Sequence, residues 1–288
     1  MIYILFAIAM LSSSFLQNGK SVTDKHKFFA PLTKSLSAEG VDSVFIEKLI
    51  NHSSVEFNEK YVKINVTGYH KKADYSSHYN SRAVRKSKEF YSEYNDLLAV
   101  AEKKYGVPKE VITSILWVET RHGSYLGSHH LPSVFVSTAM ASEQEFINLN
   151  SEVLRDTYAE GSDSLKKYMD KLSARSLKKS KWAIAEIKAL SELDKKGIDI
   201  FTLEGSWAGA FGMSQFLPSS YVEWAVDGDG DGKIDLFERQ DAIHSVANYL
   251  KTNGWGDTNQ KQRKAVYHYN HSQDYVDAVL KLAELIKV

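Results

Sequence analysis

The chain has 288 residues, of which 43% are hydrophobic and 12% aromatic, and its 36 basic side chains balance 36 acidic ones. This is the composition of a globular protein long enough to bury a real core, which excludes a disordered, collagen-like or coiled-coil chain. A net charge of zero argues against nucleic acid as a partner. The absence of cysteine excludes disulfides, thiolate metal sites, thiol nucleophiles and lipid attachment through an N-terminal cysteine.

The N-terminal segment carries an uninterrupted apolar run over residues 2–11, followed by three serines and a polar stretch. This order is typical of the core and cleavage region of a secretory signal, although no Lys or Arg precedes the run. The run is too short to cross a bilayer as a helix, and no later segment is apolar enough to do so. We therefore expect residues 1–20 to be a secretory signal and the protein to be exported, periplasmic or secreted. A buried N-terminal helix is the alternative.

The rest of the chain shows mostly helical periodicity after a mixed stretch. In that stretch the alternation typical of a half-buried strand occurs at Val62, Ile64 and Val66. A helical repeat from Phe90 to Ala101 ends at Gly106, and Pro108 suits the first turn of the next helix. Further helices are predicted over residues 182–193 and 236–252 and from 272 onward. We expect a mainly α protein with an N-terminal region at 21–88 and a helical domain at 89–288.

One interval is locally basic on a neutral protein. Between Asp163 and Lys181 few acids accompany Lys166, Lys167, Lys171, Arg175, Lys178, Lys179 and Lys181. A solvated helix face or loop is the simpler interpretation, and attraction to an anionic polymer is the alternative.

The segment 227–238, DGDGDGKIDLFE, matches the EF-hand loop at its diagnostic positions. Its predicted metal ligands are Asp227, Asp229, Asp231, Lys233 at the seventh place, and Glu238, with Asp241 one turn later as a competitor for the last position. A hard cation needs six to eight oxygens, which this arrangement supplies. Because only one such loop is visible, we expect structural Ca²⁺ that fixes the flanking helices rather than a switch. An Asp/Gly-rich turn without metal is the alternative.

Helical spacing places an acid, Glu119, on the same face as Val111, Ile112 and Ile115. It also lies in the last turn before Gly123, where the helix carbonyl ends disfavour negative charge. Burial and the helix dipole both raise the pKa of such a carboxyl, which can then donate a proton to a leaving oxygen as the general acid of a glycosidase does. From the residues alone, a buried Glu satisfied by Arg121, His122 or a backbone donor is the alternative.

Four separated motifs resemble the lytic murein transglycosylase B family and occur in the family's order. They are YGVPKEVITSILWVETRHG at 105–123, GSWAGAFGMSQFLPSSY at 205–221, the calcium loop followed by DAIHSVANYLKTNGW within 227–255, and YNHSQDY at 269–275. The resemblance covers most of the chain from about residue 89 onward. It implies a lysozyme-like helical fold with an EF-hand-type calcium loop, preceded by a small, less regular N-terminal region.

The resemblance also implies an activity on the glycan strands of bacterial peptidoglycan. Glu119 would protonate the oxygen of the β-1,4 bond between N-acetylmuramic acid and N-acetylglucosamine, and would then deprotonate the muramoyl C6 hydroxyl. That hydroxyl attacks the anomeric carbon with help from the substrate's acetamide, leaving a 1,6-anhydromuramoyl end without using water. No second acid recurs in the motifs, which fits this route better than a two-carboxylate glycosidase. We expect a monomer with peptidoglycan as its partner.

Further substrate-binding positions follow from the resemblance: Ser206, Gln215, Tyr249, Tyr269, Asn270 and Tyr275. A tyrosine offers an apolar face to a sugar ring and a hydroxyl to its oxygens. Without the resemblance, Tyr249 would be a core residue, and Ser206 and Gln215 would be ordinary turn and helix residues.

The chain departs from the family after the catalytic helix, where typical members carry two adjacent arginines thought to meet the peptide carboxylates. If the longer stretch between Asn148 and Ser180 is an insertion, Lys178 and Lys179 take their place. A lysine cannot reproduce the bidentate guanidinium fork, so recognition of the stem peptide would be altered.

Three other functions fit parts of this pattern. A muramidase, in which water resolves the intermediate, differs only in the end of the product. A non-catalytic, calcium-stapled peptidoglycan-binding module is disfavoured by the presence of Glu119 together with Gln215 and Asn270. A secreted calcium sensor is disfavoured by the single EF-hand loop.

Overall fold

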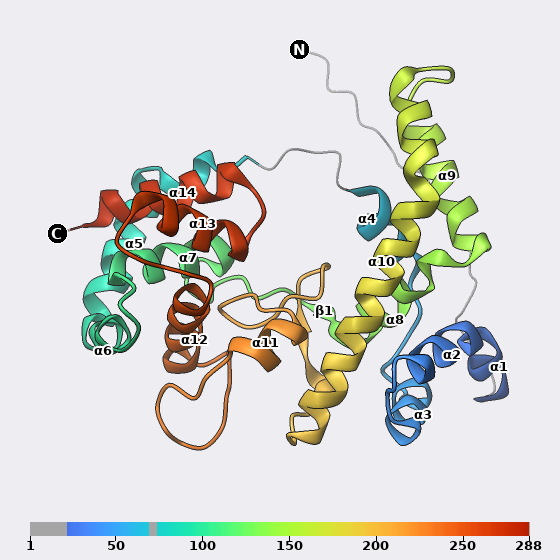
Figure 1. Cartoon of the computed structure of the whole chain (residues 1–288), viewed down its shortest axis with the longest axis horizontal. Helices are drawn as coiled ribbons and strands as arrows, with labels where there is room; N and C mark the ends of the chain where they lie inside the picture. Colours follow the sequence, from blue (N-terminus) through green and yellow to red (C-terminus); the bar gives the residue numbers. More distant parts are fainter. Residues whose placement is uncertain (1–21, 69–73, 288) are drawn as a thin grey trace, which may run out of the picture.

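The computed structural model describes residues 22–68 and 74–287, and over these ranges the chain is mostly helical (Figure 1). Within these ranges two short strands, β1 (His129–His130) and β2 (Glu204–Gly205), pair in an antiparallel ladder with His129 opposite Gly205. The secretory signal expected at 1–20 lies outside the described residues. In the described residues no helix has both the length and the apolar character needed to cross a membrane.

The α-helices follow one another through both halves of the chain. In order they are α1 (Val22–Phe28), α2 (Ala30–Ala38), α3 (Ser43–Asn51), α4 (Glu59–Thr67), α5 (Ser81–Glu93), α6 (Asn95–Tyr105), α7 (Lys109–Thr120), α8 (Leu131–Ala139), α9 (Gln144–Thr157), α10 (Asp163–Lys195), α11 (Pro218–Trp224), α12 (Arg239–Thr252), α13 (Asn259–Tyr269) and α14 (Gln273–Ile286). Short 3₁₀ turns are η2 (Ser76–Tyr79), η3 (Met140–Ser142) and η4 (Ile200–Thr202).

The strand predicted around Val62 is wrong, because these residues form α4. The Asn58 side chain caps the helix by accepting a hydrogen bond from the Lys60 N–H at 2.9 Å. The buried face repeats at helical spacing, and its members are Tyr61, Val62, Asn65 and Val66. The apolar alternation at these three positions therefore does not mark a strand. Within the described residues, the mixed stretch forms helices α1 to α4 and the 3₁₀ turn η2.

The helical repeat predicted from Phe90 to Ala101 is divided between α5 and α6 at Tyr94. The Tyr94 N–H still donates to the Phe90 carbonyl oxygen, and the Tyr94 carbonyl accepts from the Leu98 N–H. Helical hydrogen bonds therefore continue on both sides of Tyr94, and the apolar repeat in the sequence runs through the point where α5 ends and α6 begins. Gly106 ends α6 with a φ of 69°, as predicted. The domain boundary expected between residues 88 and 89 falls inside α5. The division of the chain into two domains stays a prediction.

The helix predicted over 182–193 is the last part of α10, which has 33 residues and begins at Asp163. The basic interval therefore lies on a helix, with Lys166, Lys167, Lys171, Lys178 and Lys181 exposed. The two C-terminal predictions hold: α12 buries Ile243, Val246, Ala247 and Leu250, and Ser272 caps α14 by accepting from the Tyr275 N–H.

Two groups of helices flank a central loop region (Figure 1). Helices α5, α6, α7, α12, α13 and α14 form one group, in which α14 packs on α7 and α12 on α6. Helices α4, α8, α9 and α10 form the other, with α1 to α3 beside them. The β1–β2 ladder, α11 and the loop of residues 205–217 lie between the groups. This arrangement brings the end of α7, the loop 205–217 and the start of α14 together.

Candidate active site

Glu119 lies in the last turn of α7, where buried apolar residues surround it on the helix. Its residue is half-buried, and the Tyr275 hydroxyl on α14 donates a hydrogen bond to Oε1 at 2.5 Å. Burial raises the pKa of the Glu119 carboxyl to about 7, and the Tyr275 hydrogen bond opposes part of that rise. The carboxyl therefore holds its proton close to neutral pH, as the helical spacing predicted.

The basic residues next to Glu119 do not pair with it. The Arg121 guanidinium lies over the Tyr125 ring, 4.9 Å from its centroid. His122 stacks on Phe90 at 4.1 Å, and its Nε2 lies 3.1 Å from the Thr113 carbonyl oxygen. Burial lowers the pKa of His122 to about 4, so this ring is neutral at physiological pH. Within the described residues, the partner of the Glu119 carboxyl is a tyrosine and not a cation.

The backbone after Glu119 turns sharply through three left-handed residues: Arg121 (φ 50°), His122 (φ 56°) and Gly123 (φ 87°). For a non-glycine residue this conformation costs on the order of 1–3 kcal/mol, so the surrounding contacts must hold it. The ring stacking and hydrogen bond of His122 are such contacts. The turn directs the chain from the end of α7 toward the loop 205–217.

Three of the predicted tyrosines form one stacked group beside the acid. Tyr269 lies parallel to Tyr275 at 6.4 Å, and Tyr249 meets Tyr269 edge-on at 4.7 Å. The Tyr269 hydroxyl donates to the Ser214 carbonyl oxygen at 2.6 Å, and that of Tyr249 donates to the His268 carbonyl oxygen at 2.8 Å. Burial, followed by the Glu119 charge, raises the pKa of both Tyr269 and Tyr275, so both stay protonated donors.

Tyr75 also belongs to this group, and it was not predicted from the sequence. Its ring meets Tyr275 edge-on at 5.8 Å, and the side chain of Asn270 hydrogen-bonds to it. Burial and then the Glu119 charge raise the pKa of Tyr75, which places its hydroxyl within electrostatic reach of the acid. Tyr75 directly precedes η2 and lies in no recognisable motif. Its position in a polar segment was the only feature of the sequence that could have suggested a role in binding.

The loop 205–217 carries two other predicted residues. Gln215 has a φ of 50°, and its Nε2 donates to the carbonyl oxygens of Gly212 at 3.0 Å and Leu126 at 3.3 Å. Ser206 Oγ accepts from the Ala210 N–H at 3.1 Å and so closes a turn. Gln215 is thus joined to the segment that follows α7. Ser206 has no hydrogen bond to Glu119 in the described structure.

Lys178 and Lys179 lie on α10, in the other helix group. Lys178 is exposed, and Lys179 Nζ lies 4.6 Å from the centroid of Trp182. Burial, with Arg175 and Lys178 nearby, lowers the pKa of Lys179. No hydrogen bond or ion pair joins either lysine to Glu119 in the part of the chain that the structure describes.

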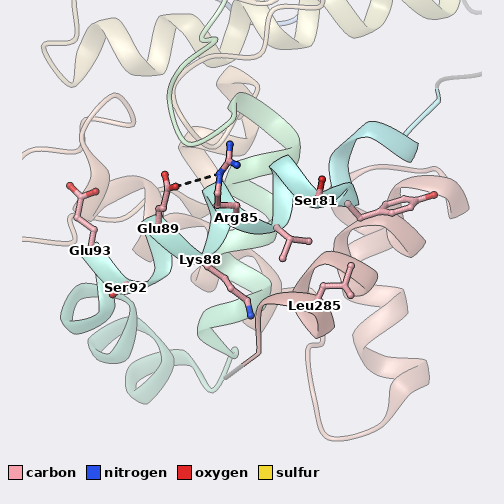
Figure 2. Close-up of a pocket in the computed structure, with 9 residues that line it drawn as sticks. Ser81, Arg85, Lys88, Glu89, Ser92, Glu93 and Leu285 are labelled. Carbon is pink, nitrogen blue, oxygen red and sulfur yellow. Dashed lines mark ion pairs between the residues drawn. The ribbon is translucent and has the colours of Figure 1, made fainter.

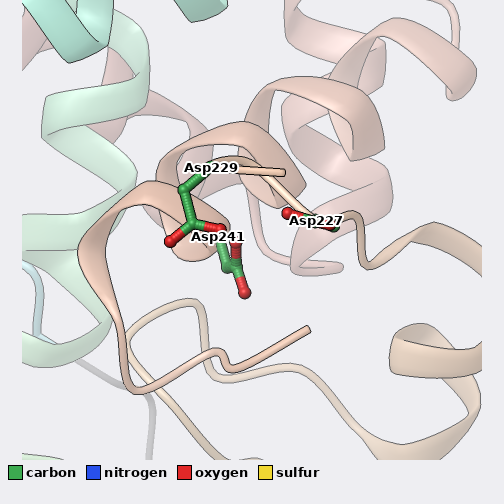
Figure 3. A group of neighbouring side chains, drawn as sticks. All are labelled: Asp227, Asp229 and Asp241. Atoms are coloured by element: carbon green, nitrogen blue, oxygen red, sulfur yellow. The ribbon is translucent and has the colours of Figure 1, made fainter. Parts of the chain in front are cut away.

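The acidic loop gathers three of the six predicted metal residues (Figure 3). Carboxylate oxygens of Asp227, Asp229 and Asp241 all lie within 4.8 Å of one another. Asp241 is 4% exposed and accepts from the N–H groups of Gly228 at 2.7 Å and Asp235 at 2.5 Å. Asp231 and Glu238 are exposed and stand outside this cluster, and the Lys233 N–H donates to Asp231 at 2.7 Å. Of the two candidates for the last position, Asp241 is the one brought to the cluster.

A separate groove of about 990 Å³ runs along the outer side of α5 (Figure 2). An Arg85–Glu89 ion pair at 3.7 Å lies on it, and Leu285 of α14 closes one edge. None of the predicted site residues lines this groove, so it is not part of the candidate site.

Comparison with known families gives one match that spans most of the chain. Residues 24–265 match the transglycosylase SLT domain family. The membrane-bound lytic murein transglycosylase B of Escherichia coli (strain K12) is 34% identical over 166 residues, which are 58% of this chain and 37% of that relative. The chain therefore aligns with well under half of this relative's length. The chain belongs to the transglycosylase SLT domain family, and the expected resemblance to lytic murein transglycosylase B is confirmed.

Solved structures share the fold. The Escherichia coli lytic transglycosylase SLT35 in complex with bulgecin A superposes with a TM-score of 0.66 at 21% identity, covering 91% of this chain and 92% of that one. SltB3 from Pseudomonas aeruginosa, in complex with NAG-anhNAM-pentapeptide, gives 0.68 at 18% identity, covering 93% and 80%. A second SLT35 structure, in complex with calcium, gives 0.65 at 21% identity, covering 93% of each chain. The predicted mainly α, lysozyme-like fold is confirmed.

Proposed function

We propose that this protein is a lytic transglycosylase that cleaves the β-1,4 bond between N-acetylmuramic acid and N-acetylglucosamine in bacterial peptidoglycan. The observation that carries this proposal is the Glu119 carboxyl, whose pKa burial raises to about 7 and whose partner is the Tyr275 hydroxyl. The family membership and the shared fold support the same substrate class.

Glu119 acts first as an acid and then as a base in this proposal. Its proton passes to the glycosidic oxygen as the bond to the anomeric carbon breaks, and the departing sugar leaves with a free hydroxyl. The resulting carboxylate takes the proton of the muramoyl C6 hydroxyl as that oxygen bonds to the anomeric carbon. The acid is restored and a 1,6-anhydro ring is formed. The Tyr275 hydroxyl stabilises the carboxylate between these two transfers, since it donates a hydrogen bond to Oε1.

The groups gathered around the acid favour an internal nucleophile. Most retaining and inverting glycosidases place a second carboxylate across the sugar from the first. An acid, Asp274, lies near enough to Tyr75 to raise its pKa. The side chains recorded around Glu119 and Tyr275 in the described residues are otherwise phenols and an amide: Tyr75, Tyr269 and Asn270. Such groups hold a sugar by stacking and hydrogen bonds, and the C6 hydroxyl of the substrate supplies the nucleophile.

Other side chains are proposed to bind the substrate. Ser206, Gln215 and Tyr249 keep the roles that the resemblance implies, and Lys178 with Lys179 is assigned to the carboxylates of the stem peptide. Two exposed rings extend this surface: Tyr125 is 64% exposed just after the catalytic turn, and Trp207 is 42% exposed next to Ser206. Exposed aromatic faces of this kind suit stacking on sugar rings.

We also propose that the acidic loop holds structural Ca²⁺. Asp227, Asp229 and Asp241 offer oxygen atoms only, and none of them is ion-paired with a basic side chain in the described residues. Burial, followed by repulsion from Asp229 and Asp227, raises the pKa of Asp241, so a bound cation would relieve an unfavourable concentration of negative charge. The structure of SLT35 in complex with calcium supports the choice of metal. The ion would fix the start of α12 relative to α11 and has no step in the reaction.

Export is part of the proposal, because peptidoglycan lies outside the cytoplasmic membrane. The apolar run at 2–11 supports it. The Escherichia coli relative is described as membrane-bound, whereas this chain has no cysteine that could carry a lipid.

The test is digestion of isolated peptidoglycan sacculi by the purified protein and by Glu119→Gln, with the soluble products analysed by mass. The proposal expects products lighter by one water than hydrolytic ones from the wild type and none from the variant. Reducing ends would identify a muramidase. Release by neither protein, with binding to sacculi retained, would identify a binding module.

A further inference from the structure

A single hydroxyl, that of Thr120, joins three parts of the candidate active site. Thr120 follows Glu119 and is 1% exposed. Its Oγ1 accepts a hydrogen bond from the Gly123 N–H at 2.9 Å and lies 3.0 Å from the carbonyl oxygen of Met213. The Leu116 carbonyl oxygen, at 3.2 Å, is the second acceptor available to the same proton. The hydroxyl therefore links the end of α7, the turn after Glu119 and the loop 205–217.

The turn has a strained backbone, and the Thr120 hydroxyl adds a side-chain contact to the backbone hydrogen bonds that hold it, such as that from the His122 N–H to the Leu116 carbonyl oxygen at 3.0 Å. Arg121 and His122 both have positive φ, and Gly123 closes the turn. A Cβ at Gly123 would lie only 3.3 Å from Met213 side-chain atoms, so turn and loop are packed closely. Without the Thr120 hydroxyl, the half-buried Gly123 N–H would lose its hydrogen-bond partner in the protein, which weakens the turn.

The loop is held from its other sides as well. The Met213 N–H donates to the Leu236 carbonyl oxygen at 2.7 Å, which ties the loop to the end of the acidic segment. The Tyr269 hydroxyl donates to the Ser214 carbonyl oxygen at 2.6 Å. Within the described residues, the Thr120 hydroxyl is thus the side-chain group of α7 that hydrogen-bonds directly to the loop 205–217.

We propose that Thr120 is a positioning residue for Glu119, holding the acid and the loop 205–217 in one fixed relation through its hydroxyl. It touches no substrate atom and exchanges no proton with it. The kinetic part of this proposal rests on the proposed lytic transglycosylase activity, and the spectroscopic part below does not.

The test compares Thr120→Val, which removes the hydroxyl at nearly constant volume, with Thr120→Ser, which keeps it. Thr113→Val is the matched control, since Thr113 lies on the same helix, is fully buried, and has a hydroxyl without a hydrogen-bond partner. For Thr120→Val we expect kcat to fall about 10- to 100-fold with KM within about threefold, because a small misplacement of a catalytic group is costly. Thr120→Ser should restore most of kcat, and Thr113→Val should leave it unchanged.

A second readout needs no substrate. The titration of the Glu119 carboxyl is followed by NMR with carbon-13 in the glutamate side chains, assigned with Glu119→Gln. In Thr120→Val the opened turn admits water to the carboxyl, so the Glu119 pKa should fall below its wild-type value, and the alkaline limb of kcat should move to lower pH by the same amount.

A purely structural role predicts a different set of results. Thr120→Val would then lower Tm while kcat of the folded enzyme, its alkaline limb and the Glu119 titration stayed at wild-type values, and this would overturn the proposal. If the wild type released no anhydro product, the proposed function would fail, and the Glu119 titration would still decide the role of Thr120.

Discussion

The hydroxyl of Tyr275 lies 2.5 Å from a carboxylate oxygen of Glu119, although 156 positions separate the two residues in the chain. Helix α7 supplies the acid and helix α14 supplies the donor, and packing of α14 on α7 brings them together. Burial is the main reason that the Glu119 pKa is raised, and the hydrogen bond from Tyr275 opposes part of that rise.

Glu119→Gln should abolish glycan cleavage while preserving the fold. A general acid contributes roughly 10²- to 10⁴-fold to a rate, and here one residue serves both proton transfers, so activity should fall by at least about 10³-fold. The amide oxygen can still accept from Tyr275, and the circular dichroism spectrum should not change. Anhydro-product release at more than about a tenth of the wild-type rate would show that another group is the acid.

The pH dependence of kcat should show an alkaline limb near the Glu119 pKa of about 7. Above this pH the carboxyl loses the proton that the leaving oxygen needs, so kcat should fall about tenfold per pH unit. Initial rates on a soluble glycan fragment at saturating concentration provide the measurement. A flat profile between pH 7 and pH 9, roughly the span over which such an acid ionises, would contradict the assignment.

Tyr275→Phe should move that limb in the opposite direction from Thr120→Val. The hydrogen bond from Tyr275 lowers the Glu119 pKa, so its removal raises the pKa and shifts the limb to higher pH. We also expect kcat to fall about tenfold or more through loss of a charge-assisted hydrogen bond. Tyr79→Phe is a suitable control on the neighbouring η2 segment, since it should leave the limb in place.

Glu119 should also weaken the folded state at alkaline pH. Its pKa is raised from 4.5 to about 7, so between these values the folded protein keeps a proton that the unfolded chain has released. The free energy of unfolding therefore falls as pH rises through this window, by up to roughly 3 kcal/mol. Denaturant unfolding should show Glu119→Gln to be more stable than the wild type at pH 8, with the gap closing below about pH 4.5, the ordinary value for a Glu carboxyl. An equal difference at both pH values would contradict a raised Glu119 pKa.

Calcium should raise Tm through the acidic loop. With Ca²⁺ at about 100 times its Kd, the gain is about 2.7 kcal/mol, or roughly 4 to 5 °C in Tm for a chain of this length. Asp241→Asn should remove most of this gain, because Asp241 is the buried member of the cluster. Glu238→Gln is the matched comparison, as its carboxyl is exposed and outside the cluster. A larger loss from Glu238→Gln would place the twelfth loop position, and not Asp241, in the site.

Features that are encoded within one helix or one loop could be predicted from the sequence, and features that depend on packing between distant segments could not. Glu119 was predicted because one helix places it on an apolar face, and Asp227 and Asp229 were predicted because the spacing of acids within one loop brings their carboxylates together. The sequence could not show whether Glu238 or Asp241 joins these two aspartates. Asp241 lies in the first turn of α12, so its position depends on how that helix packs against the loop. Tyr75 was missed for a related reason: only the packing of residues 74–79 on α14 puts it beside Tyr275.

The fold shows the same limit. The end of α6 was predicted because Gly106 is a local stop. Around Val62, three alternating apolar residues favoured a strand. The helical face of α4 also contains Tyr61 and Asn65, and their burial depends on tertiary packing, which the local pattern does not show. The division between α5 and α6 at Tyr94 involves no Gly or Pro, so the apolar repeat of the sequence does not indicate it.

The most direct test of the central claim is cleavage of peptidoglycan in water labelled with heavy oxygen. If the C6 hydroxyl of the substrate is the nucleophile and Glu119 serves it as base, the muramoyl ends released by the wild-type protein carry no label and are lighter than hydrolytic ends by one water. Label at the anomeric carbon of the released muramoyl end would show that water is the nucleophile, and would contradict the account.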